Sequence, residues 1–311
     1  MKNDPAFPAI QNLFSNDHPQ EVWAKAADIF GRIHPAYDFS DVHTAFSDVV
    51  SLYQGNYPGY GEVKTAYHDL PHTLDVFMCA VRLMHGVHLS GTRLSDKEVT
   101  LIAIASLMHD AGFAQERGTE TGTGAQFLQT HVRRSIEFML RYLAEHNFPA
   151  EWAAPLTYMI QGTDLDLPFN RIDFKDERTL LLGQIVSTAD LLGQMADRIY
   201  LEKLLLLHEE FKEAKFNFYP SPYDLLCQTT GFYKMVRQRL DGVYGGIYEK
   251  LTFHFKDSLG VERNFYLEAT EKNIAYLSKL TLLGEVKYLS MLKRSRIAKT
   301  ISAPAVPDDI G

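Results

Sequence analysis

The chain has 311 residues, of which 46% are hydrophobic and 23% are charged, an ordinary globular composition that can bury a core. Its 39 acidic and 31 basic residues leave a net charge of −8, and no lysine or arginine stripe stands out, which argues against a nucleic-acid polymer as a partner. Small phosphorylated substrates remain compatible with this charge, because a bound metal cation can supply a local positive field.

The two cysteines, Cys79 and Cys227, form no metal-binding pattern, and we expect buried free thiols in a reducing compartment. The first residues lack the apolar stretch of a signal peptide, and the most apolar run, residues 101–108, is too short to span a bilayer. The sequence therefore predicts a cytoplasmic protein with no membrane partner. The leucines at 204–207 are expected to be core or an oligomer interface, so a homo-oligomer stays open.

Prolines interrupt the N-terminal segment, residues 1–50, which is predicted to hold two short helices, the second near residues 21–32. A loop rich in Gly, Tyr and Pro, at 54–62, leads into an apolar helix predicted over 72–84. Pro71 suits the first turn of that helix, where a missing N–H has no cost.

The next helix has a predicted start, because Ser95 and Glu98 have the spacing of a capping box. It runs to Met108 and is apolar nearly all round, which is typical of a central helix of a bundle. A polar loop at 118–124 follows, and then helices are predicted over 131–145 and 151–162.

The longest helical stretch is predicted over 176–212. Pro220 and Pro222 interrupt the chain, and helices resume over 223–248 and 267–291. The tail, 298–311, is predicted to be disordered. These patterns predict an all-α fold with N-terminal helices at 1–50, a core at 51–215 and a C-terminal helical extension at 216–297 that completes the pocket.

Four side chains are candidates for a metal site: His72, His109, Asp110 and Asp190. His109 and Asp110 are adjacent at the end of a buried helix, where both can turn toward one centre. Asp190 lies in a largely apolar stretch, where a carboxylate is costly to bury unless it is paired or binds a cation. Such a mixed nitrogen and oxygen site suits Zn, Mn, Fe or Mg better than Ca, and its open positions are typical of a catalytic metal.

Each of these signals has a plainer interpretation when taken alone. Short His-Asp and His-x-x-x-His patterns give frequent false matches, and Asp190 could simply pair with Arg198 or Lys203. The set is more specific than its members, because the residues occur in order and each lies in a helical context.

The order His…His-Asp…Asp is similar to that of the HD superfamily of metal-dependent phosphohydrolases. Residues 67–76, Tyr-His-Asp-x-x-His-Thr-x-Asp-Val, resemble the signature of the class I cyclic nucleotide phosphodiesterases. Weaker matches follow at 162–165, 188–191 and 230–232, so the resemblance covers roughly residues 67–240.

The resemblance implies an HD-domain helical bundle in which His72, His109, Asp110 and Asp190 bind a first divalent metal. It also implies that Asp110 bridges to a second metal. Three further roles follow from the resemblance. His68 would be a general acid, His131 an accessory histidine near the second metal, and Phe232 an aromatic that stacks on a base.

The chain departs from the phosphodiesterase pattern at two places. Phe113 stands where that family has the last histidine of His-Asp-x-x-His, so the second metal site loses a polar neighbour. Thr229 stands where that family has the glutamine that holds a purine, although Gln228 is adjacent. We therefore expect a planar base to be bound without strict purine selection.

Three other polar residues could support the site. Asp75 could accept a hydrogen bond from a ligand imidazole and so fix its tautomer, or it could face water. Gln194 could line the pocket, although a solvated position is the plainer interpretation, and Asp164 could hold Arg198 or a histidine.

The resemblance implies hydrolysis of a small phosphoester, with a nucleotide as the expected substrate. Water activated by one or two cations would attack phosphorus, and His68 would protonate the leaving oxygen. One alternative is an HD-type di-iron oxygenase, against which Asp164 argues because it stands where an additional histidine ligand would be sought. Another is a non-catalytic ligand-binding HD domain, against which His68 argues because it accompanies a full ligand set.

Overall fold

The computed structural model describes residues 13, 14, 16 and 18–302. Within them the chain is helical and contains no strand beyond an isolated antiparallel bridge between Tyr60 and Glu116, so the predicted all-α fold class is confirmed. The α-helices are α2 (Pro19–Ile33), α3 (Ser40–Tyr53), α4 (Leu70–Leu89), α5 (Asp96–Met108), α6 (His131–Glu145), α7 (Ala153–Gln161), α8 (Glu177–Ala196), α9 (Tyr200–Glu213), α10 (Pro222–Asp241), α11 (Leu251–Leu259), α12 (Phe265–Leu282) and α13 (Ile297–Ser302). Short 3-10 turns connect several of them: η1 (Ala111–Phe113), η2 (Ala125–Phe127), η3 (Ala150–Trp152), η4 (Phe169–Arg171), η5 (Ile247–Lys250) and η6 (Tyr288–Met291).

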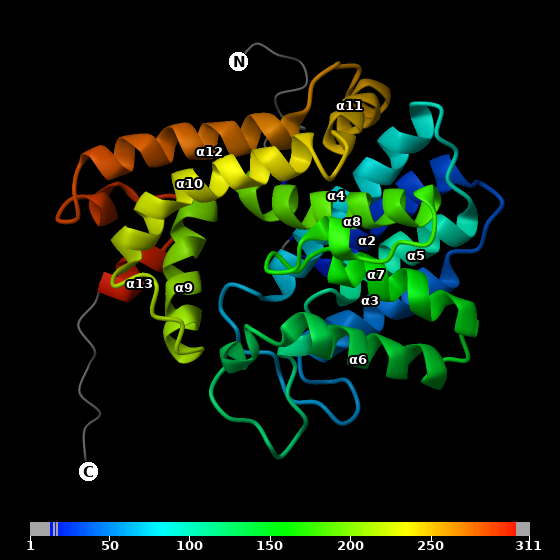
Figure 1. The fold of residues 1–311 in the computed structure, drawn as a ribbon, viewed down its shortest axis with the longest axis horizontal. Coiled ribbons are helices and arrows are strands. Elements are labelled where there is room, and N and C mark those ends of the chain that lie inside the picture. The colour runs from blue at the N-terminus through cyan, green and yellow to red at the C-terminus, as the bar shows by residue number, and fades with distance from the viewer. Residues whose placement is uncertain (1–12, 15, 17, 303–311) are drawn as a thin grey trace.

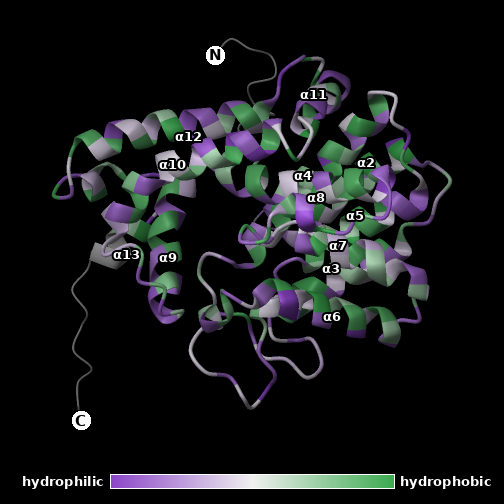
Figure 2. Cartoon of the chain, in the orientation of Figure 1, coloured by the Kyte–Doolittle hydropathy of each residue, from purple (hydrophilic) through white to green (hydrophobic). Residues whose placement is uncertain are grey.

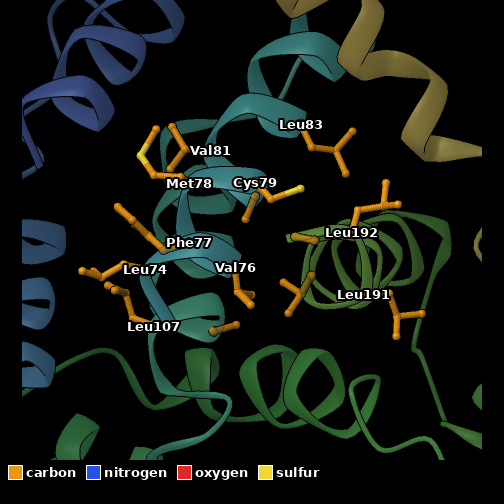
Figure 3. Close-up of a cluster of buried hydrophobic side chains, with 14 of the residues drawn as sticks. Leu74, Val76, Phe77, Met78, Cys79, Val81, Leu83, Leu107, Leu191 and Leu192 are labelled. Carbon is orange, nitrogen blue, oxygen red and sulfur yellow. The ribbon is translucent and has the colours of Figure 1, made fainter. Parts of the chain in front are cut away.

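Helix α4 is the central helix of the bundle (Figure 1) and packs against α2, α5, α8 and α11. Nearly all of its residues are buried, from its first turn to its last. Figure 3 shows the reason: Val76 points toward α8, whereas Leu74 and Phe77 point to the opposite side of α4. A helix that is apolar on every side can lie only where other helices surround it.

The start of α5 is as the sequence predicts. Ser95 accepts a hydrogen bond from the backbone N–H of Glu98, and the Glu98 carboxylate accepts one from the N–H of Ser95 at 2.7 Å, which completes the capping box. Residues 99–108 are all buried, and the helix packs against α3, α4, α7 and α8. The helix therefore ends, at His109, inside the protein.

Helix α8 crosses α4 at a glycine. A Cβ atom on Gly193 would lie 3.0 Å from the backbone oxygen of Asp75 and 3.1 Å from the Cα of Val76. A side chain at residue 193 would force the α4 backbone to move by a few tenths of an ångström, so the absence of a Cβ atom favours this close approach.

Helices α9, α10, α12 and α13 gather at one side of the bundle (Figure 1). Helix α12 packs on α8, α10 packs on both α12 and α9, and α13 packs on α9. Hydrophilic and hydrophobic residues alternate along α12 in Figure 2, as expected of a helix with one buried face. No helix in the described part of the chain combines the length and the apolar character that a bilayer span requires.

The predicted helix over 176–212 is wrong as a single element, because the structure contains α8 and α9 with a break at residues 197–199. At Asp197 the backbone turns to a ψ of 134°. Its carboxylate accepts a hydrogen bond from the N–H of Ile199 at 3.0 Å, and such a local side-chain bond competes with the helical pattern.

Other predicted bounds shift for local reasons. The helices predicted over 223–248 and 267–291 end early, at Asp241 and Leu282, each ahead of glycines with positive φ at 245, 246 and 284. Helices α3 and α11 were not predicted. Cys79 is a buried free thiol, as expected, but Cys227 is exposed.

The structure describes only part of each end of the chain. The tail predicted to be disordered begins with the helix α13, and its residues 303–311 lie outside the described residues. The second predicted N-terminal helix corresponds to α2. The first was expected before residue 21, where residues 1–12, 15 and 17 are not described.

The close approach of α8 to α4 gives a test of the packing. Gly193→Ala should lower the free energy of unfolding by about 1 kcal/mol, because the strain of shifting the α4 backbone by a few tenths of an ångström outweighs the gain in helix propensity. Gly31→Ala is the matched control, since residue 31 is also inside a helix but a Cβ atom there would have no neighbour within 4 Å; it should stabilise the protein by up to about 1 kcal/mol. Urea unfolding measures both, and a Gly193→Ala protein as stable as the wild type would contradict the tight crossing.

Candidate metal centre

Three elements bring the predicted ligands together. His72 lies in the first turn of α4, His109 and Asp110 directly follow α5, and Asp190 lies in the middle of α8. The start of α4 is fixed by the Asp69 carboxylate, which accepts the N–H of His72 at 2.8 Å. All four predicted ligand side chains are buried.

His72, His109 and Asp110 form a cluster that could hold a metal ion. The two histidine Nε2 atoms are 3.4 Å apart, and they lie 3.2 Å (His72) and 3.3 Å (His109) from Asp110 Oδ2. Ligand atoms bound at about 2.1 Å to one shared ion are separated from one another by roughly 3.0–3.4 Å. The spacing of these three donors therefore fits a single cation between them.

The hydrogen bonding of the cluster also fits a cation. Among the described residues, the buried Asp110 Oδ2 has no well-aligned hydrogen-bond donor, and an ion between this oxygen and the two imidazoles would satisfy it. His109 Nδ1 donates to the carbonyl of Ser106 at 2.9 Å. That bond leaves Nε2 as the nitrogen that can bind a metal, as is usual for histidine ligands.

Asp190 is the fourth member of the site. Its Oδ1 lies 3.8 Å from His72 Nε2 and 3.7 Å from His109 Nε2, slightly farther than the three closest donors lie from one another. Burial raises the pKa of Asp190 to about 6, against the opposing effect of His109. Its role as a ligand remains a prediction, and the position of its carboxylate is compatible with it.

Burial and the contact between His109 and Asp110 set the protonation states in the cluster. Burial lowers the pKa of His72 to about 4, so this imidazole is neutral and able to bind a metal. Burial acts to raise the pKa of Asp110, but the neighbouring His109 outweighs it and holds that pKa well below the usual range. Burial acts to lower the pKa of His109, and Asp110 more than offsets it, so the His109 pKa is raised.

His68, the predicted general acid, has a partner that the sequence alone does not indicate. Its Nδ1 donates to the Glu210 carboxylate at 2.5 Å, and the other oxygen of Glu210 accepts the backbone N–H of Tyr67 at 2.6 Å. The Glu210 side chain is 3% exposed and comes from α9. The His68 ring lies 5.7 Å from the His72 ring, centroid to centroid, which places this pair beside the metal cluster.

Phe113 separates two histidines at the edge of the cluster. Its ring stacks on His68, with centroids 4.6 Å apart, and on His131, with centroids 4.7 Å apart. His131 Nδ1 donates to the carbonyl of Leu128, while its Nε2 lies 3.5 Å from Asp110 Oδ1. An apolar ring therefore occupies the position where the phosphodiesterase pattern has a polar neighbour of a second metal, and His131 remains beside Asp110.

Asp75 and Gln194 both bond to other groups of the protein. Asp75 does not contact a ligand imidazole among the described residues; its carboxylate accepts from Asn16 at 2.8 Å and lies 3.8 Å from Lys203 Nζ. Gln194 is used inside the protein, because its amide oxygen accepts from the Tyr67 hydroxyl at 2.5 Å. Its amide nitrogen donates to the backbone oxygen of Asp190 at 3.1 Å, so Gln194 links Tyr67 to Asp190.

Asp164 organises a turn. Its carboxylate accepts the N–H of Asp166 at 2.9 Å and the N–H of Leu167 at 3.3 Å. No described contact joins it to Arg198 or to a histidine.

The predicted base-binding residues all lie on α10. The Thr229 hydroxyl is buried and donates to the carbonyl of Leu225 in its own helix at 2.8 Å. Gln228 is exposed, and Phe232 is partly buried against the hydrophobic core. No described contact joins these residues to the metal cluster, so the base-binding role remains a prediction.

The chain matches no protein-family model, no curated protein and no solved structure. Its resemblance to the HD phosphohydrolases therefore rests on the sequence motifs and remains a prediction.

The cluster predicts the metal content of simple variants. His109→Ala and Asp190→Ala should each reduce bound divalent metal from about one equivalent to a small fraction, because each removes a donor from a buried site. His43→Ala, which changes an exposed histidine in α3, is the control and should retain the metal. Elemental analysis of the purified proteins measures this, and full metal retention by Asp190→Ala would exclude Asp190 as a ligand.

Proposed function

We propose that this chain is a divalent-metal-dependent phosphoesterase acting on a small substrate, with a nucleotide as the expected substrate class. The observation that carries the proposal is the adjacency of two features: a buried cluster of two imidazoles and a carboxylate, and a histidine–glutamate pair. Hydrolysis of a phosphoester needs a means of activating water and a means of protonating the leaving oxygen, and these features suit the two tasks.

The residues that would hold the cation are His72, His109 and Asp110, with Asp190 as the predicted fourth. A divalent cation there would supply Lewis-acid chemistry to the phosphoryl group and to the attacking water. The protein contributes the rest: it keeps the donors buried and pre-positioned, so that no reorganisation is needed when charge develops.

The surroundings of His68 support its proposed role as a proton donor. Burial acts to lower its pKa, but the Glu210 carboxylate outweighs burial, and the pKa of His68 is raised. The imidazole is thereby held in its acid form at higher pH than an ordinary histidine. Glu210 also fixes the ring through Nδ1, which leaves Nε2 as the nitrogen that can serve the substrate.

The nucleotide part of the proposal rests on the motif likeness around residues 230–232. The phosphoester part rests on the cluster and does not depend on that likeness, so the two can fail separately.

A second candidate function, an HD-type di-iron oxygenase, has one observation in its favour. A third imidazole, His131, lies 3.5 Å from Asp110 Oδ1 and could extend the ligand set. Bound iron with redox activity and no phosphoesterase turnover would select this candidate.

The proton-donor role predicts a dependence on the leaving group. His68→Ala should retain bound metal and lower kcat by on the order of 10²–10⁴ for an alkyl phosphoester, whose leaving alkoxide needs a proton. The loss should be much smaller for a p-nitrophenyl ester, whose leaving group needs little protonation. Steady-state kinetics with both esters tests this, and equal losses would contradict the role.

The His68–Glu210 pair predicts a change in the pH profile. Activity that needs protonated His68 is present at low pH and falls as the pH rises through its pKa. Removing the charge in Glu210→Gln lowers that pKa, so the alkaline limb of kcat should move to lower pH. Glu209→Gln is the matched control, since the adjacent Glu209 pairs at the surface with Lys212; an unchanged limb in Glu210→Gln would contradict the pairing.

A further inference from the structure

A cavity with basic side chains in its lining lies at the other end of α4. It has a volume of about 180 Å³ and is lined by Leu13 and by residues of α2, α4 and α11, of which the charged or titratable ones are Lys25, Asp28, Arg32, Arg82, His85 and His254. Arg82 follows His72 by ten residues on the same helix, which separates the two regions by roughly 15 Å at about 1.5 Å per residue. None of the candidate metal ligands lines this cavity.

The floor of the cavity contains a buried arginine. Arg82 is 5% exposed, and its guanidinium donates to the hydroxyl of Tyr266 at 2.6 Å. No carboxylate of the described residues lies within ion-pair distance of it. A buried charge is costly when nothing opposite balances it, and a neutral hydroxyl satisfies only one of the five N–H groups of the guanidinium.

The nearby carboxylates are already engaged elsewhere. Asp28 and Asp257 lie 3.0 Å and 3.2 Å from the guanidinium of Arg32, and the three side chains are exposed at the surface. These two acids therefore sit at the rim with Arg32, and the buried guanidinium of Arg82 keeps a positive charge that no described acid pairs with.

Two histidines complete the lining as neutral groups. His85 and His254 form a hydrogen bond between their Nδ1 atoms at 2.9 Å. Burial, followed by the charge of Arg82, lowers the pKa of His254 to about 2, so it does not compete as a cation. These imidazoles can supply polar contacts without adding charge.

We propose that this cavity binds the phosphate group of a small molecule. A phosphate carries about −1.5 to −2 charges at neutral pH and offers three strong acceptor oxygens. It can accept from Arg82 on α4, and the guanidinium of Arg32 on α2 adds positive charge at the rim of the cavity. A carboxylate has one charge and lies in one plane, which matches a lining contributed by three helices less well. Arginine favours such oxyanions because its planar fork gives paired hydrogen bonds.

The test measures the thermal unfolding midpoint of the full chain in inorganic phosphate, glycerol phosphate, acetate and chloride at equal ionic strength. Wild type should show a saturable rise with either phosphate and not with acetate or chloride, as expected for a ligand that binds only the folded state. A rise with glycerol phosphate alone assigns the site to a phosphorylated molecule, and a rise with both includes free phosphate.

Two variants locate the binding. Arg82→Gln should abolish the rise, whereas Arg237→Gln should retain it; Arg237 is the matched control, because it also donates to a tyrosine hydroxyl, that of Tyr248 at 3.1 Å. His109→Ala should retain the rise, since it alters only the candidate metal centre. Loss in His109→Ala with retention in Arg82→Gln would place phosphate at the metal centre and overturn the proposal.

A third variant keeps the test decisive if Arg82→Gln fails to fold. Arg32 lies at the exposed rim of the cavity, with 46% of its side chain accessible, so Arg32→Gln leaves the buried core intact. It should raise the phosphate concentration needed for half of the shift by severalfold. No change in that concentration, or a wild-type rise that acetate reproduces, would contradict a phosphate site.

Discussion

The crossing of α8 over α4 is the contact that brings Asp190 to the candidate metal centre. At Gly193 the two backbones are so close that a single added carbon would lie 3.0 Å from the Asp75 carbonyl oxygen. Asp190 lies about one turn before Gly193, and His72 lies about one turn before Asp75. The crossing thus brings a carboxylate of one helix to 3.8 Å from an imidazole of the other. The same approach holds Gln194, which bonds Asp190, against Tyr67.

Helix α4 places two polar sites at its two ends because every side of it is covered. Its apolar residues pack on α2, α5, α8 and α11, and the polar residues that it buries must find partners inside the protein. His72 finds them in the carboxylate cluster near the start of the helix. Arg82 finds the Tyr266 hydroxyl near the other end, and no described carboxylate. The reasons for assigning a ligand differ between the two sites: at the first it is the spacing of three donor atoms, and at the second it is a buried guanidinium with no described carboxylate beside it.

Much of the architecture could be predicted from the sequence, because the deciding signals are local. The capping box at Ser95 fixed the start of α5, and the apolar sequence of α4 and α5 indicated their central position. The order of His72, His109 and Asp110 predicted a cluster that the structure brings together. The break after α8 was missed because part of its support comes from far along the chain: the side-chain amide of Asn273 in α12 donates to the backbone oxygens of Met195 at 2.9 Å and of Asp197 at 2.7 Å.

Glu210 is a residue of the candidate site that could not be predicted from the local sequence. In the sequence it is one of two adjacent glutamates on a helix, with no motif around it, and nothing local distinguishes it from Glu209. The fold separates them: Glu209 faces solvent and pairs with Lys212, whereas Glu210 is buried and holds His68 across a sequence separation of 142 residues. Only a pairing between α9 and the segment before α4 could have identified it.

The central claim is that the four candidate ligand side chains share one cation. A crystal structure of the metal-loaded protein, with anomalous diffraction collected at the metal edge, tests this claim most directly. The account predicts a single strong peak at about 2.0–2.2 Å from His72 Nε2, His109 Nε2 and Asp110 Oδ2, with an Asp190 oxygen completing the set at a similar distance. A peak elsewhere in the molecule, or metal-loaded crystals in which these four side chains have no anomalous peak between them, would contradict it.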